Sequence, residues 1–116
     1  MTMKNQTITE QDEVMARFIL AILRTDLKKV FSWGFQYPRI IKDGLRAYVA
    51  GFLYEGYIEI KFNGGKDLFE VYTFNEDGSV KDKVEDVYLD SLVNVVDGLV
   101  ERCENYEQRV HELYEI

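Results

Sequence analysis

The chain has 116 residues, 47% of them hydrophobic, which fits one compact domain but not two separate cores. Its formal net charge is −7 and its basic residues are scattered. This argues against direct binding of nucleic acid, because phosphate contacts need clustered Lys and Arg side chains. No segment approaches the ~20 apolar residues that span a bilayer, and the single cysteine, Cys103, cannot form an internal disulfide. We therefore expect a single soluble domain over residues 1–116 in a reducing cytoplasm, with no membrane partner.

A long helix is predicted near the N-terminus, from about Thr9 to Phe31, after a disordered segment at residues 1–6. A capping box at its start is offered by Thr7 with Glu10 or by Thr9 with Asp12, since each pair can satisfy free backbone N–H groups. Apolar residues occupy more than one stripe of this helix, which predicts that its middle is covered from two sides. The sheet, the last helix and a partner subunit are the candidate covers.

Beyond Trp33 the apolar period changes from that of a helix to that of a strand. Pro38 confines any strand there to a sheet edge or a late start, so the sheet is expected to begin near Arg39. Turn-forming residues then separate short apolar segments, the pattern of antiparallel hairpins. The strands are expected at Leu45–Tyr54, Tyr57–Asn63 and Leu68–Asn75, with Val87–Tyr88 as a short apolar piece after a turn at Asn75–Ser79.

Charge favours one register for two of these strands. A four-residue loop over Gly64–Asp67 places Lys61 opposite Glu70 and Phe62 opposite Phe69, whereas a two-residue turn at Gly64-Gly65 would set two glutamates against each other. Each cross-strand pair is worth ~0.2 to 1 kcal/mol, so the four-residue loop is predicted. With a two-residue turn at Glu55-Gly56, the core face would carry Val49, Gly51, Leu53, Ile58, Ile60, Phe62, Phe69 and Val71.

The opposite face of this predicted sheet is unusually aromatic for a solvated surface. It collects Tyr48, Phe52, Tyr54, Tyr57, Tyr72 and Phe74 among Arg46, Glu59, Lys61 and Glu70. Two structural explanations are that a long helix or the Trp33–Tyr37 segment covers part of it, or that tyrosines lie half exposed on a sheet. The functional interpretation is a protein-partner or homodimer surface with aromatic anchors. Stacking of nucleic-acid bases is disfavoured by the acidic charge.

A second long helix is predicted over the last part of the chain, to Ile116, with Asp90 or Ser91 as its cap and Leu89 just outside it. Its apolar residues recur at heptad a and d positions: Leu89, Leu92, Val96, Leu99, Cys103, Tyr106, Val110 and Leu113. A hairpin at Asp97-Gly98 is the alternative, but the spacing continues through this pair, which favours a helix with both residues facing outward. The first half is expected to pack in the core with Cys103 as a buried thiol, and the second half to overhang the sheet. Tyr106, Val110 and Leu113 on that overhang are candidate interaction residues.

The last 32 residues carry the whole net charge of the chain. The acids expected on the outer side of the last helix are Asp90, Asp97, Glu101, Glu104, Glu112 and Glu115. A solvated helix face explains them most simply. The alternative function is an acidic decoy that mimics nucleic acid and occupies a basic protein groove.

No catalytic, cofactor or metal motif is visible in the sequence. The only histidine, His111, falls on an outward helix position without a second ligand nearby in the sequence, and no glycine-rich phosphate loop opens a helix. We therefore expect no catalytic site, no cofactor and no metal. Since sequence does not reveal which carboxylates converge, a small-ligand binder or enzyme with a pocket between sheet and helices stays open as an alternative.

The runs Asp67–Val71, Asp77-Gly78 and Val84–Val93 resemble small uncharacterised proteins of Bacteroides-type gut bacteria, often carried on mobile or phage-like elements. The resemblance implies a bacterial cytoplasm and supplies no catalytic residue. The sequence as a whole predicts an α+β fold, an antiparallel three- to four-stranded β-meander flanked by long N-terminal and C-terminal helices. The function expected for it is a non-catalytic protein-interaction module, with either another protein or a second copy of the chain, as a homodimer, for its partner.

Overall fold

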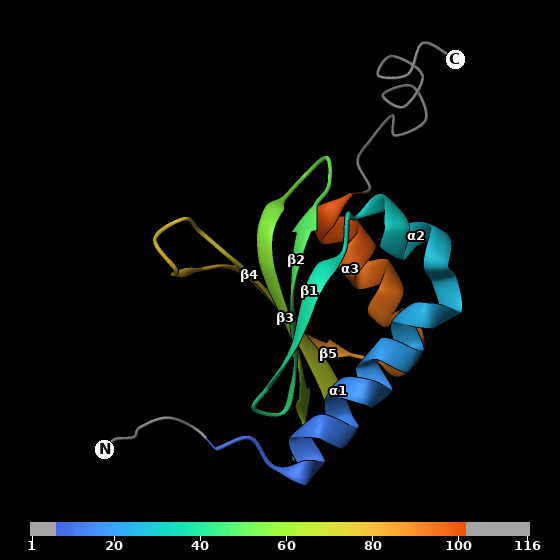
Figure 1. The fold of residues 1–116 in the computed structure, drawn as a ribbon, viewed down its shortest axis with the longest axis vertical. Coiled ribbons are helices and arrows are strands. Elements are labelled where there is room, and N and C mark those ends of the chain that lie inside the picture. Colours follow the sequence, from blue (N-terminus) through green and yellow to red (C-terminus); the bar gives the residue numbers. More distant parts are fainter. Residues whose placement is uncertain (1–6, 102–116) are drawn as a thin grey trace.

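The computed structural model describes residues 7–101, which form a layer of helices against one face of a five-stranded antiparallel sheet (Figure 1). The α+β class is as predicted, but the sheet has five strands rather than three or four. The strands follow one another across the sheet in chain order, as in a simple meander. The elements are α1 (Glu10–Leu23), α2 (Leu27–Ser32), β1 (Gln36–Ile41), β2 (Gly44–Ala50), β3 (Glu55–Asn63), β4 (Leu68–Phe74), β5 (Val80–Val87) and α3 (Leu92–Val100), with 3-10 helices at Arg24–Asp26 and Leu89–Ser91.

The predicted first helix is divided in two by its own side chains. The Thr9 and Asp12 pair forms the capping box at the start of α1. Near the end of α1 the Thr25 hydroxyl donates to the carbonyl of Ile22 at 2.6 Å. The Asp26 carboxylate then accepts from the backbone N–H of Lys29 at 3.3 Å and begins α2. Thr25 and Asp26 thus supply the end and restart of the helix through local hydrogen bonds.

The second apolar stripe of this helical pair is covered only in part. Ile19 and Leu23 are fully buried against the sheet. In contrast, Val14 is 65% exposed, Phe18 43% and Phe31 75%. The middle of the helix, at Ile19 and Ile22, is nevertheless buried and α1 contacts both the sheet and α3, two of the predicted covers, so the most exposed apolar side chains, Val14 and Phe31, lie toward the two ends of the predicted helix.

The register between β3 and β4 is the one that charge predicts. Lys61 pairs with Glu70 and Phe62 with Phe69, and a four-residue loop joins the strands. The ring centroids of Phe62 and Phe69 lie 5.2 Å apart in an edge-to-face contact. Opposite charges on one face and paired aromatic rings along the same ladder both favour this register over its alternatives.

The hairpin between β2 and β3 turns earlier than predicted. Ala50 pairs with Glu55, so the connection is a loop over residues 51–54 and not a two-residue turn at Glu55-Gly56. Gly51 and Leu53 therefore leave the core face, and Leu53 is 41% exposed. The pairing differs from the predicted one by an even number of residues, so Val49 keeps its place in the core.

The loop at residues 51–54 is held by the end of α3. The carbonyl of Val100 accepts hydrogen bonds from the backbone N–H groups of Leu53 at 2.8 Å and Tyr54 at 3.2 Å. The carboxylate of Glu101 accepts from the backbone N–H of Phe52 at 3.0 Å. These long-range hydrogen bonds stabilise the four-residue loop, which replaces the predicted two-residue turn. No local sequence pattern predicts them.

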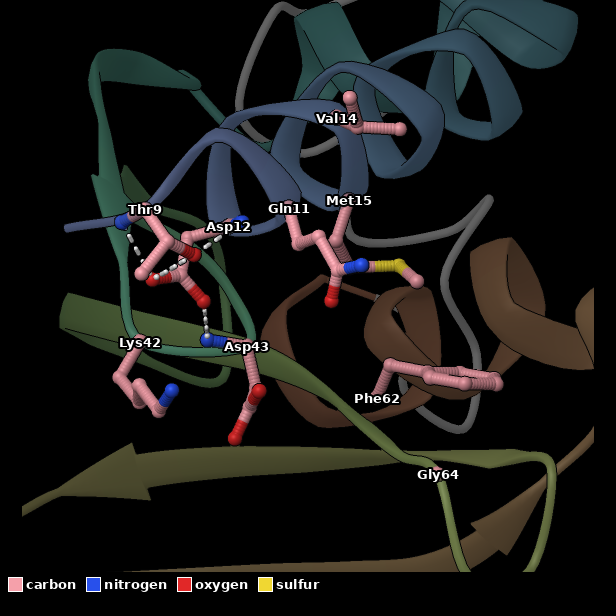
Figure 2. Close-up of a pocket in the computed structure, with 9 residues that line it drawn as sticks. All are labelled: Thr9, Gln11, Asp12, Val14, Met15, Lys42, Asp43, Phe62 and Gly64. Atoms are coloured by element: carbon pink, nitrogen blue, oxygen red, sulfur yellow. Dashed lines mark hydrogen bonds between the residues drawn. The ribbon is translucent and has the colours of Figure 1, made fainter.

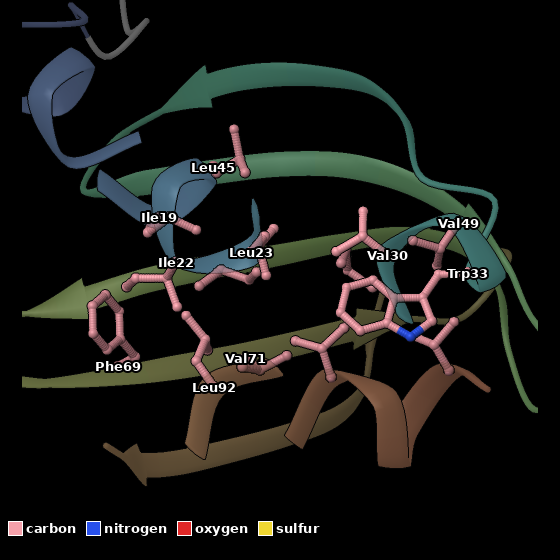
Figure 3. Close-up of a cluster of buried hydrophobic side chains, with 14 of the residues drawn as sticks. Ile19, Ile22, Leu23, Val30, Trp33, Leu45, Val49, Phe69, Val71 and Leu92 are labelled. Carbon is pink, nitrogen blue, oxygen red and sulfur yellow. The ribbon is translucent and has the colours of Figure 1, made fainter. Parts of the chain in front are cut away.

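The core lies between the helices and the sheet and is filled by large side chains (Figure 3). Trp33 is fully buried, as are Ile19 from α1, Val71 from β4 and Leu92 from α3. The helix α3 passes through Asp97-Gly98 without a hairpin, and Gly98 is exposed, both as predicted. Ser91 occupies the predicted N-cap position, although its side chain makes no capping hydrogen bond.

Two acids, one in α3 and one directly after it, that we expected on the outside are buried. Asp97 is 7% exposed and Glu101 is 6% exposed. The side chain of Asp97 accepts from the indole N–H of Trp33, and that of Glu101 accepts from the backbone N–H of Phe52. The helix is flanked by Trp33 and by the 51–54 loop, which supply donors to both carboxylates, so the heptad prediction of an outward acidic row fails at these positions.

Several expectations lie outside the described residues. These are the disorder of residues 1–6, the helix continuation to Ile116, the buried Cys103, the outward His111, the acids Glu104, Glu112 and Glu115, and the overhang residues Tyr106, Val110 and Leu113.

Candidate functional site

One face of the sheet is left uncovered by the described helices. Figure 1 shows α1, α2 and α3 on one side of the sheet and no helix on the other. The register brings together on that side Arg46, Tyr48, Tyr57, Glu59, Lys61, Glu70, Tyr72 and Phe74, which we call the open face. All of them belong to the predicted aromatic face, whereas its predicted cover by a long helix is not found among residues 7–101.

Two residues of the predicted aromatic face lie instead in the loop at residues 51–54. Phe52 is half-buried there, and Tyr54 is only 7% exposed. The Tyr54 hydroxyl lies 2.7 Å from the carbonyl of Tyr57 and 2.9 Å from that of Phe74, and it accepts from the Phe74 N–H at 3.0 Å. Tyr54 therefore joins three segments of the fold and is not available as an interaction anchor.

The tyrosines of the open face are held in place by charged neighbours. The rings of Tyr48 and Tyr57 meet edge to face at 5.3 Å, and the Tyr48 hydroxyl donates to Glu55 at 2.7 Å. The Tyr72 hydroxyl donates to Glu70 at 2.6 Å. Lys61 lies 5.3 Å from the centroid of the Tyr72 ring. These contacts agree with the explanation that tyrosines lie half exposed on the sheet, and they give the open face a defined shape.

The same contacts move the pKa values of the groups involved. The hydrogen bond to Glu55 raises the pKa of the Tyr48 phenol. Burial, followed by the hydrogen bond to Glu70, raises that of Tyr72. Hydrogen bonds from Tyr72 and Asn63 lower the pKa of Glu70. Both phenols therefore stay protonated donors, and Glu70 an ionised acceptor, across the neutral pH range.

A hollow of about 180 Å³ lies at the β1 side of the open face and is lined by Tyr37, Arg39, Arg46 and Tyr57. Arg39 and Arg46 are register partners, so two positive charges stand directly opposite each other. The Arg46 guanidinium lies 4.5 Å from the centroid of the Tyr57 ring, and its contact with Glu59 is long, at 3.9 Å. Its Nε is buried without a hydrogen-bond partner among the described residues. We call this the cationic hollow.

A second hollow of about 430 Å³ adjoins the first. Its lining includes the carboxylates of Glu55, Glu59 and Glu76, together with the Phe74 ring and the turn at residues 75–78. Tyr57 and Arg46 line both hollows. The Tyr57 side chain, 43% exposed, therefore stands between them. We call this second one the acidic hollow, since three carboxylates face one guanidinium in it.

Both edges of the sheet carry features that oppose the addition of another strand. In β1, Pro38 lacks an N–H, and Tyr37 lies at a register irregularity with φ of 58°. In β5, the pairing with β4 is irregular at two places, and Asp86 has φ of 58°. Proline, irregular pairing and charged residues are the usual means by which edge strands avoid pairing. Both edges are therefore poorly suited to the addition of a further strand.

A third hollow, of about 550 Å³, lies between the start of α1 and the turn that joins β1 to β2 (Figure 2). Asp12 points into this junction, where it accepts from the backbone N–H groups of Thr9 and Asp43, both at 2.9 Å. These bonds lower the pKa of Asp12. Asp12 is 2% exposed, so its carboxylate serves the fold, and the sequence revealed its capping role but not its link to the hairpin.

A fourth hollow, also of about 550 Å³, lies on the helix side, between α1 and the start of α3. Phe18, Ile22 and Val93 give it an apolar lining, and the carboxylates of Asp26 and Asp90 lie at it as well. It is the main rival to the open face as a place for a partner.

Little in the described residues favours catalysis. Within residues 7–101, His, Cys, Asp and Glu side chains form no group of three or more that could hold a metal ion. Buried apolar side chains fill the centre of the space between sheet and helices, and the third hollow opens only at its margin, between the start of α1 and the sheet. No helix in the described range has the length and apolar character needed to cross a membrane.

Comparison with known proteins found no match: no family model, no curated protein and no solved structure is similar to the chain. The resemblance to small proteins of Bacteroides-type bacteria therefore stays a prediction.

Proposed function

We propose that this protein is a non-catalytic protein-interaction module whose contact surface is the open face of the sheet with its two hollows. The observation that carries the proposal is the position of Tyr57, an exposed aromatic side chain standing between a cationic and an acidic hollow. Aromatic and arginine side chains dominate the binding energy of protein interfaces, and Tyr57 and Arg46 are stacked here on rigid strands.

The charge pattern favours a protein over a nucleic acid as the partner. A phosphate backbone presents negative charge at regular intervals, so a strand that reached the cationic hollow would also cross Glu55, Glu59 and Glu76. A protein surface carries both signs and is able to match both hollows.

The acidic-decoy alternative loses two members of its charge row. Asp97 and Glu101 are buried and hydrogen-bonded inside the fold, so neither projects into solvent. Asp90 is exposed, as that alternative requires. Among the described residues Asp90 is thus the one exposed member of that row, and Glu104, Glu112 and Glu115 lie outside them.

Site-specific photo-cross-linking tests the proposal. The photoreactive residue p-benzoylphenylalanine replaces Tyr57 or Tyr72 on the open face and, in the matched control, Phe31 on the helix layer, in the full chain expressed in bacterial cells. Phe31 is 75% exposed, so the control position is at least as accessible as Tyr57. We expect one discrete intermolecular product, identified by mass spectrometry, from both open-face positions and none from Phe31.

Two results would count against the proposal. Capture from the Phe31 position but not from Tyr57 would move the contact surface to the helix layer. A product that stays at the mass of one chain would mean that the open face is covered from within the chain.

A further inference from the structure

We propose that the occupant of the open face is a second copy of this chain, related by a twofold axis that passes near Tyr57. The cationic hollow of each copy then faces the acidic hollow of the other. This inference rests on the proposed function and names the partner for the same surface.

The arrangement of the two hollows carries the argument. In a twofold interface, where residue i of one copy meets residue j of the other, residue j also meets residue i, so a surface that pairs with itself must carry both halves of each contact. The cationic and acidic hollows are such halves, and they adjoin along Tyr57 and Arg46. A twofold axis at this boundary places the cationic hollow of each copy against the acidic hollow of the other.

Charge balance also singles out this surface. With a net charge of −7, two copies repel each other over most of their surfaces. The open face and its hollows are close to neutral: Arg39, Arg46 and Lys61 are the cations, and Glu55, Glu59, Glu70 and Glu76 the acids. The helix-side hollow has Asp26 and Asp90 at it, so it suits a second acidic chain less well.

In a single copy of the chain, the charges and hydrogen-bond donors of the cationic hollow are not fully paired. Arg39 and Arg46 face each other as like charges, and the buried Nε of Arg46 has no partner among the described residues. Like charges directly opposite on neighbouring strands are unfavourable, as is an unpaired buried donor. A carboxylate from the acidic hollow of the second copy offsets the like charges of Arg39 and Arg46, because guanidinium groups bind carboxylates through charge-assisted hydrogen bonds.

The experiment is sedimentation equilibrium of the full chain from micromolar to near-millimolar concentration, with two charge-reversed variants and a control. Arg39→Glu places a carboxylate beside Arg46 and cancels the net positive charge of the cationic hollow, whereas Glu55→Lys with Glu76→Lys reverses the sign of the acidic one. Each variant alone loses the attraction between opposite charges at both contacts, so the dimer dissociation constant should rise by more than about tenfold. Mixed in equal amounts, the two variants should form a heterodimer, because one contact is then native and at the other the introduced carboxylate meets the introduced lysines.

The control is Arg24→Glu, an exposed arginine at the end of α1, which should leave dimerisation unchanged. Circular dichroism shows whether each variant is folded. A wild-type chain that stays monomeric throughout, or a mixture of the reversed variants that does not associate, would overturn the inference. If Tyr57 then captures a different protein on photo-cross-linking, the proposed function stands with another partner, whereas no capture from the open face overturns both.

Discussion

The indole Nε1 of Trp33 donates a hydrogen bond of 2.9 Å to Oδ1 of Asp97, although the two residues lie 64 positions apart in the chain. Trp33 follows α2 and is fully buried, and Asp97 lies in α3. Each side chain is the partner that lets the other be buried, since an unpaired indole N–H or carboxylate would be costly in the interior. The bond therefore joins the two helical segments that cover the sheet.

Replacing Asp97 should separate the loss of the acceptor from the loss of the charge. Asp97→Leu leaves the Trp33 N–H unpaired in the core and should lower the free energy of unfolding by about 1 to 3 kcal/mol. Asp97→Asn retains an acceptor oxygen and should lower it less. Urea unfolding followed by fluorescence measures both, since Trp33 is the only tryptophan. Equal losses in the two variants would show that the hydrogen bond does not matter to stability.

Two glycines should respond to alanine in opposite directions. A Cβ on Gly51 would overlap the carbonyl oxygen and side chain of Val100, so Gly51→Ala should destabilise the fold by about 1 to 3 kcal/mol through overpacking. A Cβ on Gly98 would meet no atom within 4 Å, and α3 contains this glycine in its interior. Gly98→Ala should therefore stabilise the fold by about 0.5 to 1 kcal/mol. Thermal unfolding of both variants measures these changes in stability. A neutral Gly51→Ala variant would contradict the packing of the loop at residues 51–54 against α3.

Acid should weaken the junction at Asp12. Hydrogen bonds from the backbone N–H groups of Thr9 and Asp43 hold the pKa of Asp12 below its ordinary value of 3.8. Because the folded pKa is the lower one, the stabilisation is complete above the ordinary pKa and is lost as the pH falls through the folded value. Asp12→Asn should therefore be less stable than the wild type at neutral pH, and the difference should shrink in strongly acidic solution.

Glu10→Gln is the matched control for Asp12, since it removes a charge from an exposed position in the same helical turn. Urea unfolding of the wild type and both variants over a series of pH values provides the comparison. A gap between wild type and Asp12→Asn that stayed constant with pH, or one of the same size for Glu10→Gln, would speak against the role given to Asp12.

Two tyrosines near the open face should have separable roles. Tyr54→Phe removes a buried hydroxyl that bonds to the backbone of Tyr57 and Phe74, so it should cost about 1 to 2 kcal/mol of stability without changing association. Tyr57→Ser removes a ring that is 43% exposed and should weaken association more than stability. Denaturation and sedimentation on the same preparations distinguish the two effects. An association loss confined to Tyr54→Phe would contradict the assignment.

The local sequence pattern was sufficient to predict the structure where it depends on the pairing of two neighbouring strands. The charges of Lys61 and Glu70 and the rings of Phe62 and Phe69 identified the β3–β4 register, because cross-strand neighbours are short-range and follow directly from sequence spacing. The division of the sheet into a core face and an aromatic face followed from the same register. Most of the predicted aromatic residues accordingly lie on the open face.

Long-range partners account for what the sequence did not reveal. The heptad pattern predicted Asp97 and Glu101 on the outer side of the helix, because periodicity alone treats every acidic side chain as solvated. In the structure both are buried, since Trp33 and the loop at residues 51–54 donate hydrogen bonds to their carboxylates. The strand β1 was only partly expected, since Pro38 and the irregular pairing after Gln36 disguise it as a connection. The cationic hollow depends on that strand, so Tyr37 and Arg39 were not among the predicted site residues.

The proposed binding surface is the open face and not the helix layer. Solvent paramagnetic relaxation of aromatic ring protons by a soluble gadolinium complex, measured by NMR on dilute and concentrated protein, tests it most directly. The account predicts that the Tyr57 and Tyr72 rings are accessible in dilute protein and become protected in concentrated protein, while Phe31 stays accessible in both. Protection of Phe31 with unchanged access to Tyr57 and Tyr72 would contradict it.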